Sequence, residues 1–391
     1  MKFVLFGVFM IVAYHPYLVL TSEGPRGGPL VVDTRRGIVL PPAEVKRAAR
    51  HILAEDLILF PGLINAHDHL ELNHFPRSKF REVYTNARAW AADMSVRLDD
   101  APFAGLRAWP LRDRCWSGGL KNLLSGVTTV VQHNLLHRPL RARRFPVQVW
   151  RRYTWAHSLY LSAPEAIQRA SQSKSPFFIH LAEGTDPTAE AEYNQLAALG
   201  AATARTILIH GVGLRGDTLR EAGLTCAGLV WCPSSNVYLL GTTADVRPWA
   251  EARKLMLGSD SRLTADGDLL DELRAASATE QIGPRDLFEA VTSTPAGVLS
   301  APQLGDLRPG CRADVLALKV KPDIDPYTVL CASGRADVGW VMRSGCIVWE
   351  QSESRANCTL DGVPYHLAPH LWRIARKLRN GIPGLEFRAR A

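Results

Sequence analysis

Short apolar runs alternate with longer segments of helical periodicity through the middle of the chain, from residue 59 to residue 281. The runs are apolar throughout, which is the pattern of strands buried on both faces of a parallel sheet. Seven runs are clear, and an eighth is expected in the short interval at 154–161; the seven lie at 59–67, 127–134, 146–150, 176–183, 206–214, 227–233 and 254–260. The pattern predicts an α/β fold, a TIM-like (β/α)8 barrel that is distorted around its third and fourth strands.

Both ends of the chain have β-character instead. Residues 1–58 combine short apolar runs with turn residues, and comparable runs return after Ala301, two of them joined by a Ser-Gly hairpin signal. The final segment, which contains HLWRIARKLR, has the pattern of an amphipathic basic helix. The expected organisation is β-structure at 1–58, the barrel at 59–300, β-structure at 301–360 and a basic helical tail at 361–391.

The N-terminus and the cysteines bear on location. Lys2 precedes an apolar run, FVLFGVFMIVAY, that resembles the core of a signal peptide, but no clean cleavage site of small residues follows it. The run is too short to cross a bilayer, so we expect a buried strand and no integral membrane span. The seven cysteines are scattered and form no CxxC pair, which is typical of a reduced protein. The expected location is the cytoplasm, and the apolar run leaves export open.

The formal net charge of +8 comes mostly from arginine, with one basic run at 138–152 and another after Leu371. Such runs can bind nucleic acid or anionic lipid. Neither run is accompanied by a nucleic-acid motif, so we expect solvated basic faces and no nucleic-acid partner. The role of the basic tail stays open.

Residues with metal-binding side chains stand at the carboxyl ends of several apolar runs. His67 and His69 end the first run, and residues i and i+2 of a strand point to the same side, so the pair is suited to one ion. His180, His210 and Asp260 each end or follow a later run. Strand ends meet on one face of a barrel, where active sites lie. The sequence therefore predicts a metal-dependent active site.

Three neutral imidazoles and one carboxylate favour zinc or ferrous iron, and such a site leaves a position for water. A bound divalent ion makes hydroxide available near neutral pH. Glu183, three residues after His180, is expected to pass a proton from water to the leaving group. The alternative for Glu183 is a structural role behind the ligands.

Five segments in order resemble the amidohydrolase superfamily: PGLINAHDHLE, FIHLAE, LIHGVGL, WCPSSN and LGSDS. LRPGCRADVLAL resembles the segment that, in this superfamily, joins the N-terminal strands in a composite β-sandwich domain. The resemblance covers roughly residues 30–355. It is greatest to the mononuclear branch of cytosine, guanine and adenosine-type deaminases and triazine chlorohydrolases.

The resemblance implies one metal ion and a role for each residue. His210 would orient water or substrate, or act as a fifth ligand, Glu183 would be the proton shuttle, and Asp260 would also act as the base. The ligands implied are His67, His69, His180 and Asp260.

The lysine positions support a single ion. Members with two ions bridge them with a carboxylated lysine from a middle strand. No lysine occurs between Lys121 and Lys174, and neither of these ends an apolar run.

Three histidines depart from the family pattern: His133, His137 and His157 have no obvious counterpart in it. His133 stands at a strand end, where it either faces the pocket or is structural.

Other residues near the predicted ligands could line a substrate pocket. Arg262 is a candidate clamp for an anionic group, with an ion pair to Asp266 or Asp268 as the alternative. The remaining candidates are Glu71, Asn73, His74, His133, Trp231, Ser235 and Asn236.

The function expected is hydrolysis of a C–N bond in a small molecule, by deamination of a heterocycle or amidine or by cleavage of an amide. The alternatives are a non-catalytic amidohydrolase-like scaffold and a polyanion-binding protein that acts through the arginine runs. The sequence leaves open the substrate, the metal in the cell and a homo-oligomeric state.

Overall fold

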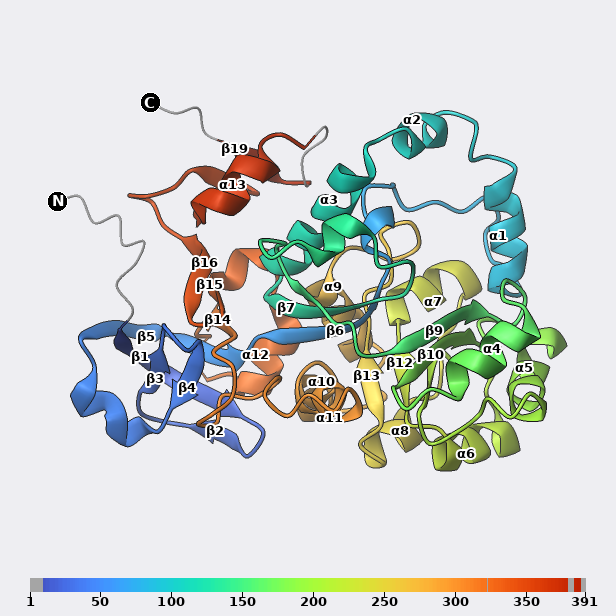
Figure 1. Ribbon diagram of the computed structural model, residues 1–391, viewed down its shortest axis with the longest axis horizontal. Coiled ribbons are helices and arrows are strands. Elements are labelled where there is room, and N and C mark those ends of the chain that lie inside the picture. The colour runs from blue at the N-terminus through green and yellow to red at the C-terminus, as the bar shows by residue number, and fades with distance from the viewer. Residues whose placement is uncertain (1–9, 322, 379–382, 388–391) are drawn as a thin grey trace.

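The structure is a computed structural model that describes residues 10–321, 323–378 and 383–387 (Figure 1). The first part of the apolar N-terminal run, residues 3–9, lies outside this range. The rest of the run begins strand β1 (Ile11–Thr21), as expected for a buried strand. None of the helices in the described ranges combines the length and the apolar character that crossing a membrane requires.

Both ends of the chain contribute to one sheet of eleven strands (Figure 1). At its centre β5 (Arg50–Pro61) pairs in parallel with β1 and antiparallel with β14 (Val315–Lys319), so the two ends are interleaved. The other members are β2 (Gly24–Arg26), β3 (Leu30–Asp33), β4 (Ile38–Leu40), β15 (Val338–Arg343), β16 (Cys346–Gln351), β17 (Cys358–Leu360), β18 (Val363–Leu367) and β19 (Leu385–Phe387).

This terminal sheet curls over an apolar core. Backbone hydrogen bonds join Val39 of β4 to the segment that leads into β14, through Gly310 and Cys311. The sheet thus returns on itself, and buried side chains such as Leu30 and Leu59 fill the space inside. Within the described residues the hydrogen-bonded ladder of this sheet is continuous.

The C-terminal tail is more than the basic helix that its pattern predicts. Helix α13 (Pro369–Ala375) is present, but β18 precedes it and β19 follows it, and they pair with β16 and β17. Leu371 and Trp372 of the helix are buried against the core. The helical prediction was incomplete because a short strand such as β19 is stabilised by its partner strand, and its own sequence gives little signal.

Eight strands that pair in parallel form the centre of the described structure, and each coincides with one of the eight predicted apolar runs, except that β6 ends one residue beyond its run. Three form one sheet: β6 (Leu63–Asp68), β7 (Val127–Gln132) and β8 (Gln148–Val149). Five form another: β9 (Thr154–Ser158), β10 (Phe177–Leu181), β11 (Thr206–His210), β12 (Gly228–Trp231) and β13 (Leu255–Leu257). The first break between the sheets, from β8 to β9, coincides with the distortion expected around the third and fourth strands.

The second break lies between β13 and β6, which are in contact without a strand ladder. Asp260 donates a backbone hydrogen bond to the carbonyl of His67 at 3.1 Å. A Cβ at Gly258 would lie 2.6 Å from the Cβ of His67, so only glycine permits this approach.

Helices connect and cover the central strands (Figure 1). Several begin with proline in the first turn, where its missing N–H is not needed. Besides α13, the helices of the described residues are α1 (Ala87–Ser95), α2 (Phe103–Arg107), α3 (Leu111–Leu124), α4 (Pro164–Ser171), α5 (Pro187–Ala198), α6 (Gly216–Thr225), α7 (Pro233–Leu240), α8 (Arg247–Glu251), α9 (Leu269–Ser277), α10 (Pro284–Ala290), α11 (Ser293–Val298) and α12 (Pro326–Ala332). Short 3-10 turns are η1 (Pro42–Arg47), η2 (Leu70–Leu72), η3 (Arg138–Arg141) and η4 (Arg335–Asp337).

Candidate metal centre and active site

The predicted ligands converge at the carboxyl ends of the central strands. Ligand atoms of His67, His180 and His210 lie within 4.8 Å of one another, and so do those of His67, His69 and Asp260. All five residues are buried. Because His67 belongs to both groups, the two groups describe one centre.

The hydrogen bonds of two histidines leave their Nε2 atoms free to bind a cation. Nδ1–H of His180 donates to the carbonyl of His157 at 2.8 Å, and Nδ1–H of His210 donates to Oδ1 of Asn236 at 2.8 Å. In a neutral ring the other nitrogen then carries the lone pair. Nε2 of His180 lies 3.3 Å from Nε2 of His67, as expected of nitrogens directed at one position.

Burial keeps the rings of His67 and His180 neutral. It lowers the pKa of His67 to about 3, and it lowers the pKa of His180 well below its ordinary value. Neutral imidazole is the form that ligates metals. The Nδ1 atoms of His67 and His69 are buried and have no hydrogen-bond partner among the described residues.

Asp260 supplies the carboxylate of the centre. Its Oδ1 lies 3.6 Å from Nε2 of His67 and 3.5 Å from Nε2 of His69. Its Oδ2 accepts hydrogen bonds from Ser235 Oγ and Thr264 Oγ1, each at 2.9 Å. Burial alone would raise the pKa of Asp260, but its interactions with the imidazoles of His67 and His69 hold this pKa well below the usual range.

The backbone at two of these positions is unusual. Asp260 has a φ of 48° and His210 a φ of 73°, the left-handed region that side chains other than glycine seldom adopt. Such conformations cluster at functional sites, where the surrounding structure holds them. With imidazole nitrogens and one carboxylate converging in a buried space, the donor set fits a single divalent metal ion.

Glu183 lies beside this centre, after the end of β10. Its Oε1 is 3.5 Å from Nε2 of His210. Burial raises the pKa of Glu183 to about 7, so the carboxyl can gain or release a proton near neutral pH. The turn before it is left-handed, with a φ of 53° at Ala182, and the Ala182 N–H donates to Glu192 Oε2 at 2.5 Å.

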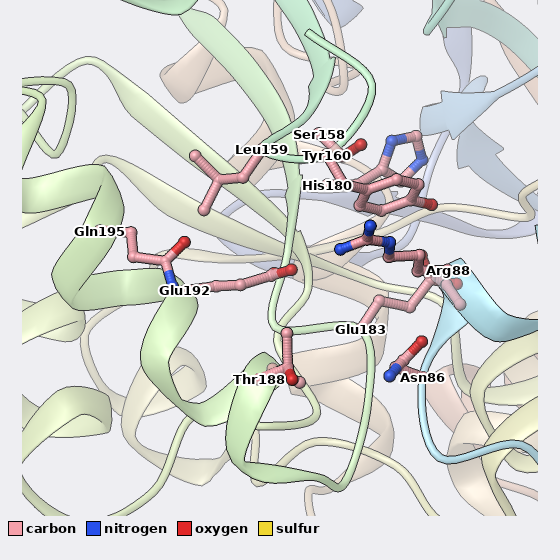
Figure 2. A pocket seen from close by; sticks show the side chains of 12 residues that line it. Asn86, Arg88, Ser158, Leu159, Tyr160, His180, Glu183, Thr188, Glu192 and Gln195 are labelled. Carbon is pink, nitrogen blue, oxygen red and sulfur yellow. The ribbon is translucent and has the colours of Figure 1, made fainter. Parts of the chain in front are cut away.

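A cavity of about 150 Å³ adjoins His180 and Glu183 (Figure 2). Glu192 lines its other side, and burial raises the pKa of this carboxyl to about 7 as well. Figure 2 shows Glu192 and Arg88 extending toward the cavity from different elements, with Tyr160 at its edge. The cavity therefore opens next to the proposed proton carrier and is lined by polar groups. Glu192 was not identified from the sequence, because it lies within a helix.

Two of the predicted lining residues instead hold side chains of the predicted metal ligands. Ser235 bonds to Asp260 and Asn236 to His210. Glu71 accepts hydrogen bonds from Gln132 and Asn134, at 2.7 and 2.8 Å. Ser235 and Asn236 thus orient predicted metal ligands, whereas Glu71 orients two neighbouring amide side chains.

Asn73 and Trp231 are also among the predicted lining residues, and each donates a hydrogen bond to another side chain. Asn73 donates to Asp68 at 2.8 Å. Trp231 is fully buried and donates to Thr243 Oγ1 at 2.6 Å, which also accepts from Asn236. Trp231 thus lies in the core behind Asn236.

Arg262 lines a second cavity, of about 410 Å³, which Asn73 and His74 also line. Among the described residues the alternative ion pairs do not form, because Asp266 pairs with Arg77 and Asp268 with Arg335. Burial lowers the pKa of Arg262. Its guanidinium therefore faces a cavity with no carboxylate within ion-pair distance in the described part of the chain.

Two of the three unassigned histidines, His133 and His157, pack against His180 of the predicted metal centre. Together with that centre they form the histidine cluster. The ring centroid of His133 lies 4.3 Å from that of His180, and its Nε2–H donates to the carbonyl of Ala156 at 3.1 Å. The ring centroid of His157 lies 4.7 Å from that of His180, and the backbone carbonyl of His157 accepts the hydrogen bond from His180 Nδ1–H. His137 stands apart, at the start of η3.

The sequence missed a polar network around Asp68, the residue between His67 and His69. Nζ of Lys121, on α3, lies 3.1 Å from Asp68 Oδ2. Asn122 donates to the same carboxylate at 2.7 Å. Lys121 is thus committed to Asp68, and it belongs to neither metal-binding group among the described residues. An acidic residue between two histidines, at position 68, was the signal that could have indicated a buried cationic partner.

Known proteins resemble this chain in sequence and in fold. The family model described as Amidohydrolase family matches residues 156–348. A 5-methylthioadenosine/S-adenosylhomocysteine deaminase of Nitratidesulfovibrio vulgaris is 28% identical over 223 residues, which is 50% of this chain and 50% of the relative. An 8-oxoguanine deaminase of Pseudomonas aeruginosa is 30% identical over 149 residues, which is 34% of this chain and 33% of the relative. The chain thus spans half or less of the length of these curated relatives.

Solved structures share the fold over most of the chain. An adenosine deaminase from Xanthomonas campestris with bound zinc has a TM-score of 0.70 at 17% identity, covering 86% of this chain and 92% of that protein. A triazine hydrolase from Arthrobacter aurescens has a TM-score of 0.71 at 16% identity, covering 87% and 94%.

Proposed function

Because this chain belongs to the amidohydrolase superfamily, we propose that it is a metal-dependent hydrolase that cleaves a C–N bond of a small molecule. The observation that carries the proposal is the convergence of His67, His69, His180, His210 and Asp260 beside the Glu183 carboxyl. A non-catalytic scaffold would be expected to lack such ligands, and a polyanion-binding protein would not need them.

We propose zinc as the ion, with ferrous iron as the alternative, because nitrogen donors and one carboxylate suit both. His67, His69, His180 and Asp260 would hold it, with His210 as a further ligand or an orienting group. The ion supplies Lewis acidity that makes water a competent nucleophile near neutral pH.

The protein's own groups then manage the protons. The ionised Asp260 accepts a proton from the attacking water, and Glu183 delivers a proton to the departing nitrogen. Transfer of the proton from Asp260 to Glu183 then restores both carboxyls, so that water is divided between the two products. His210, held by Asn236, faces Glu183 and orients the reacting group. A pKa of about 7 suits Glu183 because it is half-protonated near neutral pH.

For the substrate we propose an amino-substituted heterocycle or an amidine, with a cyclic or linear amide as the alternative. The relatives named above are deaminases of such compounds. The 150 Å³ cavity beside Glu183 is similar in size to cavities that admit one benzene ring. Arg262, which faces the second cavity without a carboxylate partner, would bind an anionic group of a larger substrate.

The finer architecture and location also belong to this proposal. We take the eight central strands as a (β/α)8 barrel, with 1–58 and 301–360 as its composite β-sandwich domain. A cytoplasmic location agrees with seven cysteines that form no disulfide in the described residues.

The test combines metal analysis with an activity screen. Purified protein should contain about one equivalent of zinc or iron per chain, and it should release ammonia from at least one aminated heterocycle or amidine. A new carboxylate without ammonia would identify an amidase. Metal-free protein that cannot be loaded with either ion would refute the metal centre.

A further inference from the structure

The segments that carry the predicted ligands lie on two sheets that no strand ladder joins within the described residues. His67 and His69 stand at the end of β6, an edge of the three-stranded sheet, whereas Asp260 follows β13, an edge of the five-stranded sheet. Ladder hydrogen bonds therefore do not fix the distance between the imidazoles and the carboxylate. Other contacts across this seam, between β6 and β13, must do so: the backbone hydrogen bond from Asp260 to His67 is one, and polar side chains add to it.

Lys121 of α3 spans the seam. Its Nζ lies 3.1 Å from Asp68 Oδ2 on the β6 side. It also donates to Ser259 Oγ at 3.0 Å and to the backbone carbonyl of Asp260 at 3.3 Å on the β13 side. An ammonium group has three protons, so its donors are fully used by these contacts.

The carboxylate of Asp68 is equally occupied. Its Oδ1 accepts from Asn73 at 2.8 Å, and its Oδ2 accepts from Asn122 at 2.7 Å in addition to Lys121. Asn65 extends the network across the seam by donating to Ser259 Oγ at 2.8 Å. Asp68 lies between two predicted ligands, yet these bonds hold it away from ligation.

A buried ion pair contributes little net stability, because removing both charges from water offsets most of their attraction. Lys121 is 2% exposed and Asp68 is fully buried. The physical effect of this pair is therefore on position. It fixes the residue between the two histidines relative to the residue that supplies the carboxylate.

We propose that Lys121 is a positioning residue: its contacts with Asp68, Ser259 and Asp260, which we call the clasp, hold the end of β6 to the end of β13. The clasp thereby sets the affinity of the centre for its metal ion. This inference rests on the proposed function, because it assumes that His67, His69 and Asp260 bind an ion. Partners behind the ligands typically change metal affinity by about 10–100-fold when they are replaced.

The sign of the effect separates positioning from simple electrostatics. A positive charge close to a bound dication repels it, so removing the ammonium would tighten binding if charge alone mattered. Loss of the clasp would instead weaken binding, because the ligands would no longer be held in one arrangement.

The experiment measures zinc affinity of the full chain by competition with a chromophoric chelator, and the visible absorption spectrum of the Co²⁺-loaded protein. Lys121→Met is expected to weaken zinc binding about 10–100-fold and to change the Co²⁺ spectrum. The matched control is Lys254→Met. Lys254 immediately precedes β13 at its other end, and its Nζ bonds to the carbonyls of Gly223 and Cys226 at 2.7 and 2.9 Å. The control should keep both the affinity and the spectrum of the wild type.

A double variant, Lys121→Met with Asp68→Asn, guards against misfolding because it leaves no unpaired buried charge. It should also bind zinc more weakly than the wild type. Wild-type affinity in either variant, or tighter binding by Lys121→Met, would overturn the clasp while leaving the proposed function intact. Absence of metal binding by the wild type would overturn the proposed function itself.

Discussion

The terminal sheet and the histidine cluster are buried to a similar degree but are held together by different forces. Inside the sheet, Leu30 and Leu59 are fully buried among other apolar side chains. In the cluster, His67 and Asp68 are fully buried too, but among polar groups. An apolar side chain needs only space of the right size, whereas a buried polar side chain needs a specific partner. The sheet therefore supplies stability, and the cluster defines positions.

The largest expected effect is in the cluster. His180→Ala should lose both bound metal and turnover, because it removes a converging nitrogen that no neighbour can replace without moving. Metal content and the rate of substrate hydrolysis are measured on protein whose fold is checked by circular dichroism. His137→Ala, which alters a histidine outside the cluster, should retain both. Full metal content and rate in His180→Ala would show that the β10 ligand is wrongly assigned.

Glu183→Gln should separate binding from chemistry. The metal should stay, while kcat should fall about 10²–10⁴-fold, because the amide cannot carry the proton. Metal content and kcat are compared with those of Glu190→Gln, a change on α5 at a half-exposed position that should leave both unaltered. An unchanged kcat would contradict the shuttle role.

The sheet should show the opposite pattern. Leu30→Ala should lower the free energy of unfolding by about 2–5 kcal/mol, because it leaves a cavity in the sheet core. The folded fraction should keep its metal and its kcat. Urea unfolding measures the change, and Leu53→Ala, at an exposed position of β5, should have almost no effect. Loss of metal from folded Leu30→Ala would show that the two regions are coupled.

The smallest effect, counted for each pH unit, is on the pH dependence of stability. Burial raises the pKa of Glu272, on α9, to about 8, so the folded protein keeps a proton that the unfolded chain releases at lower pH. Folding stability should therefore fall as pH rises from roughly 4.5 to 8, by about 1.4 kcal/mol per pH unit for this one proton. Glu272→Gln should remove this contribution, so the difference between the two unfolding curves should grow with pH. Parallel curves would contradict the raised pKa.

Local pattern was enough to locate the central strands and the metal-binding side chains that stand at their ends. Each of the eight apolar runs contains a strand, including the short one at 154–158. His67, His69, His180, His210 and Asp260 could be selected because strand ends meet on one face, so a residue's place in its own run indicates its place in the site.

Pairings across long sequence distances were decided only by the tertiary structure. The break between β13 and β6, and the clasp of Lys121 over it, depend on groups 138 residues apart in the chain. Arg262 has no acidic partner among the described residues because two other arginines pair with the nearby carboxylates. Arg77 pairs with Asp266 and Arg335 with Asp268. β19 exists because β17 is there to pair with it. Periodicity is a property of neighbours along the chain and therefore specifies which residues are buried, whereas a buried polar group is defined by a partner that only folding brings near.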